Sequence, residues 1–228
     1  NTGVEGGETA IKLAKKWGYE VKGIPENQAR IIFAANNFWG RTQAAISSST
    51  DPSSFKGFGP FMPGYDIIPY NDLEALDTAL QNPNIAAFMV EPIQGEAGVM
   101  VPDAGYLSGV REICTKHNVL FIADEVQSGY GRSGKFFAHQ WHDVQPDLIT
   151  IAKGMGNGFP VGGVLISPKI EAWFGMLGTT FGGAPLACAA SIAVIDVIEK
   201  ENLIENALEI GNYLIEELKK LPGVIEVR

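Results

Sequence analysis

Short apolar runs alternate along the chain with stretches of helical periodicity. The runs expected to form strands cover residues 30–35, 66–69, 85–90, 119–123, 148–152 and 163–166. The helical patterns cover residues 5–17, 71–80, 103–117, 184–199 and 203–221. Alternation of this kind is typical of a mainly parallel sheet with helices on both faces. The sequence therefore predicts an α/β fold, with Gly18 ending the first helix and Asn71 capping the second.

One of these runs ends on a lysine. Lys153 follows the apolar residues 148–152 and is succeeded by glycines at 154, 156 and 158. A glycine-rich backbone lets a flat ligand approach closely, and a lysine in such a cleft can act as a nucleophile and a base. The plainer interpretation of Lys153 alone is a salt-bridged lysine at a strand end.

A second run ends on an acid. Residues 119–123 lead into Asp124, and acids at the carboxyl end of a buried strand face the ligand crevice of an α/β sheet. Lys153 and Asp124 could therefore share one crevice. An aldehyde cofactor with a protonated ring nitrogen needs this pair, a lysine for covalent attachment and a carboxylate beside the pyridinium, and pyridoxal 5'-phosphate meets the description.

The sequence around both residues resembles a known family. DEVQSG at 124–129 and PDLITIAKG at 146–154 are similar to the cofactor-attachment signature of class III aminotransferases, pyridoxal enzymes of fold type I. Four further blocks match the family in order: NTGVE at 1–5, NFWGRT at 37–42, EPIQGEAG at 91–98 and TTFGG at 179–183. Within the family, residues 1–128 resemble ornithine aminotransferases and the remainder resembles acetylornithine aminotransferases.

The resemblance implies how the cofactor is held. Lys153 and Asp124 are the implied catalytic residues, and the sheet is of a seven-stranded type. The other implied cofactor ligands are Gly3 and Val4 for the phosphate, Phe38 for stacking on the ring, Gln127 for the phenolic oxygen and Thr180 for the phosphate of the neighbouring subunit. Taken without the resemblance, residues 2–4 are equally well a plain helix N-terminus, and such aromatics are more often core residues.

The resemblance also implies a substrate site and a reaction. Trp39, Arg41 and Glu96 would bind substrate, and Glu96 would pair with an arginine of a C-terminal domain. The implied activity is transfer of the δ-amino group of ornithine to 2-oxoglutarate by a homodimer, giving glutamate 5-semialdehyde and glutamate. Acetylornithine is the alternative donor. The segment 47–64 is expected to form an ordered loop over this site.

Other classes of protein remain in view. Glu91 and Glu96 flank a turn and could form a glycosidase acid–base pair or bind a metal. The glycines at 129, 131 and 134 fit G-x-G-x-x-G, which suggests a dinucleotide-binding dehydrogenase, although no long helical pattern follows them. The three histidines show no zinc-type spacing with cysteine, so no metal is expected. A large-domain fragment that dimerises without turnover is a further hypothesis.

Composition limits the partners. The 228 residues are 46% hydrophobic and 19% charged, with a net charge of −9, which argues against nucleic acid or an anionic membrane surface as a partner. Two cysteines without a framework favour a reducing compartment, and we expect a cytoplasmic protein.

The two ends suggest a division into domains. We expect residues 1–222 to form the cofactor-binding large domain. Residues 223–228 have the pattern of a new strand and are expected to begin a C-terminal small domain, so that this domain and an N-terminal segment lie outside the chain.

Overall fold

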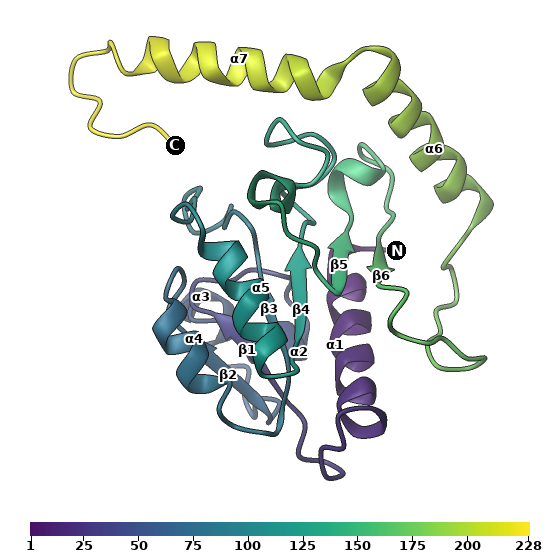
Figure 1. The fold of residues 1–228 in the computed structure, drawn as a ribbon. Helices are drawn as coiled ribbons and strands as arrows, with labels where there is room; N and C mark the ends of the chain where they lie inside the picture. Colours follow the sequence, from purple (N-terminus) through teal and green to yellow (C-terminus); the bar gives the residue numbers. More distant parts are fainter.

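The computed structural model describes residues 1–228, and its centre is a single six-stranded sheet (Figure 1). The strand order is β2-β1-β3-β4-β5-β6. The strands are β1 (Arg30–Ala34), β2 (Tyr65–Ile68), β3 (Ile85–Val90), β4 (Leu120–Asp124), β5 (Leu148–Ile151) and β6 (Gly163–Ile166). The first five strands are mutually parallel, and β6 is antiparallel to β5. The predicted mainly parallel α/β architecture is confirmed, with six strands in place of seven.

Residues of each central strand alternate between two apolar layers. Phe33 and Met89 belong to the layer beneath α1 (Gly3–Glu20), whereas Ile32 and Phe88 belong to the opposite layer. The opposite layer is covered by α4 (Leu73–Ala79) and α5 (Tyr106–Lys116). Successive side chains of a strand point to opposite faces, so helices are needed on both sides to bury them.

Two helix boundaries differ from the prediction. Helix α1 passes through Gly18 to Glu20, because Gly18 provides a close contact with the sheet: a Cβ there would lie 3.0 Å from the Ala86 Cβ. Helix α4 is capped by Asp72 instead of Asn71. The Asp72 carboxylate accepts a hydrogen bond from the Ala75 amide at 2.8 Å, and Asn71 lies in the left-handed region, with φ 63°.

The structure also contains four helical elements of three to five residues, and the second of them lies within the segment 47–64. These are α2 (Gln43–Ile46), α3 (Pro52–Phe55) and the 3₁₀ helices η1 (Ala138–His142) and η2 (Lys153–Met155).

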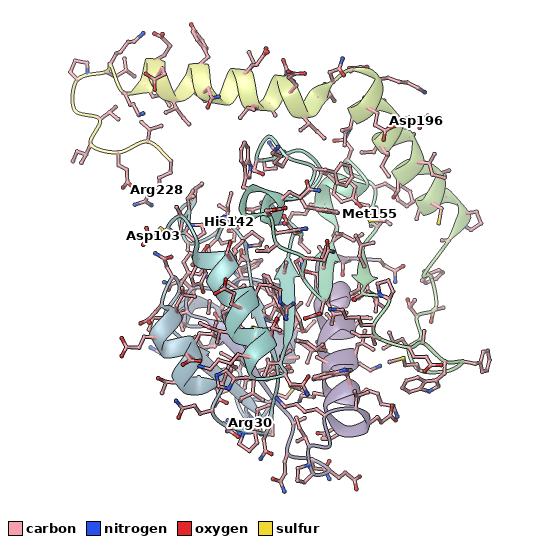
Figure 2. All side chains as sticks on the ribbon, viewed as in Figure 1. Arg30, Asp103, His142, Met155, Asp196 and Arg228 are labelled. Atoms are coloured by element: carbon pink, nitrogen blue, oxygen red, sulfur yellow. The ribbon has the colours of Figure 1, made fainter.

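Arg30, at the start of β1, and Met155, just after β5, lie at opposite edges of the sheet in Figure 2. The carboxyl edge of the parallel strands is therefore the edge that carries Met155.

Helices α6 (Pro185–Lys200) and α7 (Leu203–Leu218) arch away from the sheet (Figure 1). Helix α7 has no buried residue, and residues 223–228 form no strand. The prediction of a strand there is wrong, because these residues pair with no strand of the sheet. Instead, Arg228 Nη1 donates to the Gly98 carbonyl at 2.9 Å. None of the helices combines the length and the apolar character required to cross a bilayer.

Candidate active site

The residues that follow four of the parallel strands lie at the same edge of the sheet. Strands β1, β3, β4 and β5 are succeeded by loops that carry Phe38, Glu91, Val126 and Lys153. The N-terminus of α1 reaches the same edge, since a Cβ on Gly3 would lie 2.8 Å from Val126. A cavity of about 410 Å³ lies among these elements, and its walls include Gly3, Val4, Phe38, Val126, Lys153 and Phe159.

Lys153 enters this cavity from a strained turn. It is exposed and has φ 43°, a left-handed conformation that is uncommon for a residue with a long side chain. It begins η2 immediately after the buried residue Ala152. The sequence correctly predicted that the lysine lies in a cleft, and strain of this kind is typical of functional positions.

Asp124 ends the neighbouring strand β4, two residues before the cavity-wall residue Val126. It is the Cα partner of Thr150, three residues before Lys153, and is only 5% exposed. Its Oδ1 accepts hydrogen bonds from Thr150 Oγ1 at 2.8 Å and from the Val126 amide at 3.1 Å. Burial raises the pKa of Asp124 to about 6, while these hydrogen bonds and the charge of Lys153 lower it. The charge of Lys153 therefore acts on Asp124 at one edge of the sheet, although burial is the dominant influence on Asp124.

Glu91 is a third ionisable residue at this edge, and sequence reasoning missed its role. It follows β3, whose Val90 pairs with Ala123, so Glu91 and Asp124 are the next residues of two adjacent strands. Glu91 is 7% exposed, and its Oε1 accepts from the Phe38 amide at 2.9 Å. Burial, and then the charge of Asp124, raise the pKa of Glu91 to about 8. A carboxyl group directly after a fully buried strand was the signal in the sequence.

The aromatic pair after β1 has two separate roles. Phe38 is half-buried on the cavity wall, and the exposed Arg41 guanidinium lies 5.7 Å from its ring centroid. Trp39 is 6% exposed, stacks on Phe33 at 5.8 Å and donates its indole N–H to Ser48 Oγ at 2.8 Å. Trp39 also lines the first cavity, so the predicted substrate contact by Trp39 stays a prediction, although most of the indole is packed in the core and its only donor is engaged.

Three other predicted ligands lie outside the walls of this cavity. Gln127 Nε2 donates to Glu96 Oε1 at 3.0 Å. Gln127 borders a second cavity of about 500 Å³, which Leu208 of α7 also lines. Thr180 is exposed and lines a third cavity of about 540 Å³, next to Asn1, which borders the first cavity as well. None of the three residues lines the first cavity, and their roles as ligands stay predictions.

Glu125 anchors the loop that carries Val126 and Gln127. Its carboxylate is fully buried and accepts from Ser128 Oγ at 2.5 Å, from the amides of Ala138 and His139 at 3.0 and 2.8 Å, and lies 2.9 Å from His139 Nδ1. The loop after β4 is thereby fixed to η1. Sequence reasoning missed this anchor, because the donors lie 13 and 14 residues further along the chain.

The glycines at 129, 131 and 134 do not form a dinucleotide-binding turn. In such a turn the glycines follow the strand directly and open a long helix. Here the next helical element is the five-residue η1, and Gly131 and Gly134 have φ values of 87° and 83° beside Ile204 and Leu208. The geometry opposes the dehydrogenase alternative. No group of three or more His, Cys, Asp or Glu side chains is arranged to hold a metal ion.

The residues around the first cavity fit pyridoxal phosphate. The first amides of α1 have no acceptor within the helix, which suits a phosphate at Gly3 and Val4. Phe38 and Lys153 line the cavity and provide a flat apolar wall and an amine, and the buried Asp124 carboxyl group lies close enough to Lys153 to be affected by its charge. These groups therefore match the parts of the cofactor: the amides match its phosphate, the aromatic ring and the carboxyl group match its pyridine ring, and the amine matches its aldehyde.

The known proteins that this chain resembles in sequence are aminotransferases. Residues 1–228 match the family described as aminotransferase class-III. Mitochondrial ornithine aminotransferase of Rattus norvegicus is 58% identical over 226 residues, which cover 98% of this chain and 52% of the rat protein. Ornithine aminotransferase of an Exiguobacterium species is 51% identical over 233 residues, covering 100% of this chain and 58% of that protein.

Solved structures agree with these relatives. Ornithine aminotransferase from Toxoplasma gondii superposes with a TM-score of 0.97 at 44% identity, over 100% of this chain and 56% of that one. A second structure of that enzyme reveals partial occupancy of PLP at its active site. Acetylornithine aminotransferase from Elizabethkingia anophelis gives a TM-score of 0.82 at 47% identity, over 96% of this chain and 52% of that one.

The chain spans about half the length of the curated relatives that it matches. Within that span the match to the family is continuous, and it includes the strand ends that carry Asp124 and Lys153. The cofactor of this family is pyridoxal phosphate, whose chemistry the first cavity suits. The fold, the site and the family match agree, and the chain belongs to the class III aminotransferases.

Proposed function

We propose that the complete protein transfers the δ-amino group of ornithine to 2-oxoglutarate, giving glutamate 5-semialdehyde and glutamate. The observation that carries this proposal is the placement of Asp124 at the end of β4 and of Lys153 just after the adjacent parallel strand β5, where Lys153 lines a cavity with a helix N-terminus in its wall. The donor is supported by relatives named ornithine aminotransferases, which are 51–58% identical to this chain.

Lys153 and Asp124 each have a definite task in this proposal. Pyridoxal phosphate, when bound, supplies an electron sink conjugated to the reacting carbon. Lys153 provides the amine that attaches the cofactor and then accepts and returns the proton at the reacting carbon. Asp124 stabilises a positive charge on the ring nitrogen, and its ionisation is favoured by Thr150 and Lys153.

Other residues orient the reactants. Phe38 is held against the cavity by the bond from its amide to Glu91 and can stack on the ring. Arg41 is exposed beside Phe38, and its planar guanidinium is suited to a substrate carboxylate. Gln127 and Thr180 remain proposed ligands for the phenolic oxygen and for the phosphate of a neighbouring subunit in a homodimer. A cytoplasmic location also remains part of the proposal.

Acetylornithine is the alternative donor. The structural similarity to the Elizabethkingia anophelis enzyme favours it, as does the sequence after residue 128. The two donors differ at the α-amino group, which is an ammonium in ornithine and a neutral amide in its acetylated form. A comparison of kcat/KM for the two donors in the complete protein tests the proposal. We expect at least tenfold preference for ornithine, and preference for acetylornithine would contradict it.

The hypothesis of an inactive scaffold is tested on the chain itself. The 228-residue chain is incubated with pyridoxal phosphate and reduced with borohydride, and its peptides are weighed. A cofactor adduct on the peptide that contains Lys153 supports a cofactor-binding unit. Absence of the adduct from the folded chain, while the complete protein forms it, would indicate that this part is only a scaffold.

A further inference from the structure

One asparagine of the chain is followed directly by glycine, and this pair, Asn157-Gly158, lies close to the first cavity. Both residues are exposed, and they belong to the turn between η2 and β6. Gly158 lines the cavity together with Lys153 and Phe159. None of the roles proposed above uses the Asn157 side chain.

The backbone amide of Gly158 is free, although the amides on either side of it are bonded. Asn157 N–H donates to the Gly154 carbonyl at 3.3 Å, and Phe159 N–H donates to the Gly156 carbonyl at 3.0 Å. The Gly158 amide between them donates to no backbone carbonyl. A Cβ built on Gly158 would meet no atom within 4 Å, so the backbone there is uncrowded. The Gly158 nitrogen is therefore accessible to the carbonyl carbon of the Asn157 side chain.

An asparagine that precedes glycine can lose ammonia without an enzyme. The Gly158 nitrogen attacks Cγ of Asn157 and forms a new C–N bond, and the bond from Cγ to the side-chain nitrogen breaks. The proton of the Gly158 amide leaves with that nitrogen as ammonia, and a cyclic succinimide remains. Water then opens the ring at either carbonyl, which gives aspartate or its isomer isoaspartate. Glycine favours ring closure because it has no Cβ to hinder the approach.

The product changes both the charge and the length of a segment of the cavity wall. Either product carries a carboxylate where asparagine is neutral, directly beside the wall residue Gly158. Isoaspartate also adds a methylene group to the main chain between Lys153 and Phe159, both of which line the cavity. Pyridoxal phosphate, which this cavity suits, has an anionic phosphate group, and like charges repel. Conversion at residue 157 therefore opposes cofactor binding.

We propose that Asn157-Gly158 is a site of spontaneous deamidation, and that conversion there weakens the binding of pyridoxal phosphate. The inference goes beyond transamination, because ring closure needs only these two residues, and ring opening needs only water. Asn27 provides an internal comparison. It is also exposed and has φ 63°, against 44° for Asn157, but it precedes Gln28, whose amide donates to the Pro25 carbonyl at 3.0 Å.

The first test measures conversion in the complete protein during incubation at mildly alkaline pH. Samples are digested under acidic conditions, which stop the reaction, and mass analysis follows each asparagine as a gain of about 1 Da. We expect Asn157 to convert at least about tenfold faster than Asn27. Isoaspartate, separated from aspartate by chromatography, is the signature of the succinimide. The Asn157→Gly variant tolerates the positive φ and should release less ammonia.

The second test measures the dissociation constant of pyridoxal phosphate by absorbance titration. The incubated parent protein should bind the cofactor about threefold more weakly than fresh protein. Asn157→Asp introduces the charge without lengthening the main chain, so it should weaken binding by an amount that decreases as salt is added. Asn157→Gly should keep its affinity through the incubation, which controls for other forms of ageing.

Two kinds of result would overturn the inference. One is conversion at Asn157 that is no faster than at Asn27, or that gives aspartate without isoaspartate. The other is a cofactor affinity that stays constant in the incubated parent, or that falls equally in Asn157→Gly. Neither readout uses an amino donor. Failure of the proposed function is recognised separately, because the complete protein would then not turn over ornithine.

Discussion

Thr150 Oγ1 donates a hydrogen bond to Asp124 Oδ1 at 2.8 Å between Cα partners of adjacent parallel strands. Thr150 is fully buried, and its hydroxyl partly offsets the burial that raises the pKa of Asp124 to about 6. The register of two strands therefore determines the ionisation of the proposed ring-nitrogen partner. Lys153 lies three residues after Thr150, so β5 and the residues directly after it provide both the hydrogen bond and the positive charge that lower the pKa of Asp124.

Thr150→Val should weaken cofactor binding at mildly acidic pH. Valine has nearly the same shape but no donor, so the pKa of Asp124 rises further above about 6. The cofactor is held by ionised Asp124, and its affinity falls as pH drops through that pKa. We expect the midpoint of a plot of pyridoxal phosphate affinity against pH to move upward by about one unit. An unchanged midpoint would exclude Thr150 from this role.

Glu91→Gln should reduce the pH dependence of stability in the cofactor-free protein. The pKa of Glu91 is raised from an ordinary value of 4.5 to about 8, so the folded state holds this proton more tightly than the unfolded chain. The resulting stability is complete below about pH 4.5 and is lost as pH rises through about 8. The Gln variant cannot lose a proton, and its amide oxygen still accepts from Phe38.

The measurement for Glu91 is a series of thermal melts between pH 5 and pH 8. The melting temperature of the parent should fall across this window, and that of Glu91→Gln should fall less. Glu112→Gln is a suitable control, because Glu112 is exposed on α5. Equal slopes in all three proteins would mean that Glu91 is already ionised in the folded state.

Glu125→Gln should destabilise the fold. The buried carboxylate receives bonds from two backbone amides and a serine hydroxyl, and an NH₂ group on one oxygen would face these donors. We expect a loss of about 3 kcal/mol in the free energy of unfolding by urea denaturation, against less than about 0.5 kcal/mol for Glu112→Gln. Equal losses would show that the anchor contributes little.

Two helical glycines should respond oppositely to alanine. A Cβ on Gly7 of α1 would lie 2.6 Å from the Trp39 ring, whereas one on Gly211 of α7 would meet nothing within 4 Å. Gly7→Ala should cost about 1–3 kcal/mol through overpacking, and Gly211→Ala should gain about 1 kcal/mol through helix propensity. Urea denaturation of both variants measures this. Stabilisation by Gly7→Ala would mean that α1 can move away from Trp39 freely.

Much of the architecture follows from short-range pattern. The strands β3 and β6 have the predicted bounds, because short apolar runs between polar residues predict strands directly; β3 is fully buried, whereas β6 is partly exposed. Lys153 and Asp124 were identified because each follows such a run. Parallel pairing then brings them to one edge without information from elsewhere in the chain.

The remaining features depend on contacts between distant residues. The bond from the Phe38 amide to Glu91 spans 53 positions, and the Gln127–Glu96 bond spans 31. Neither has a local sequence signature. The strand predicted at 223–228 is absent for a related reason: its valine and isoleucine side chains favour a strand, but a strand also needs a partner strand, and these residues pair with none.

The most direct test of the account is to locate the residue that binds the cofactor in the complete protein. Borohydride reduction with pyridoxal phosphate, followed by peptide mass analysis, should place a single adduct on Lys153. Lys153→Ala should remove the adduct, and Asp124→Asn should retain it with weaker cofactor binding. An adduct on another lysine, or one that survives in Lys153→Ala, would contradict the assignment on which the proposed transamination depends.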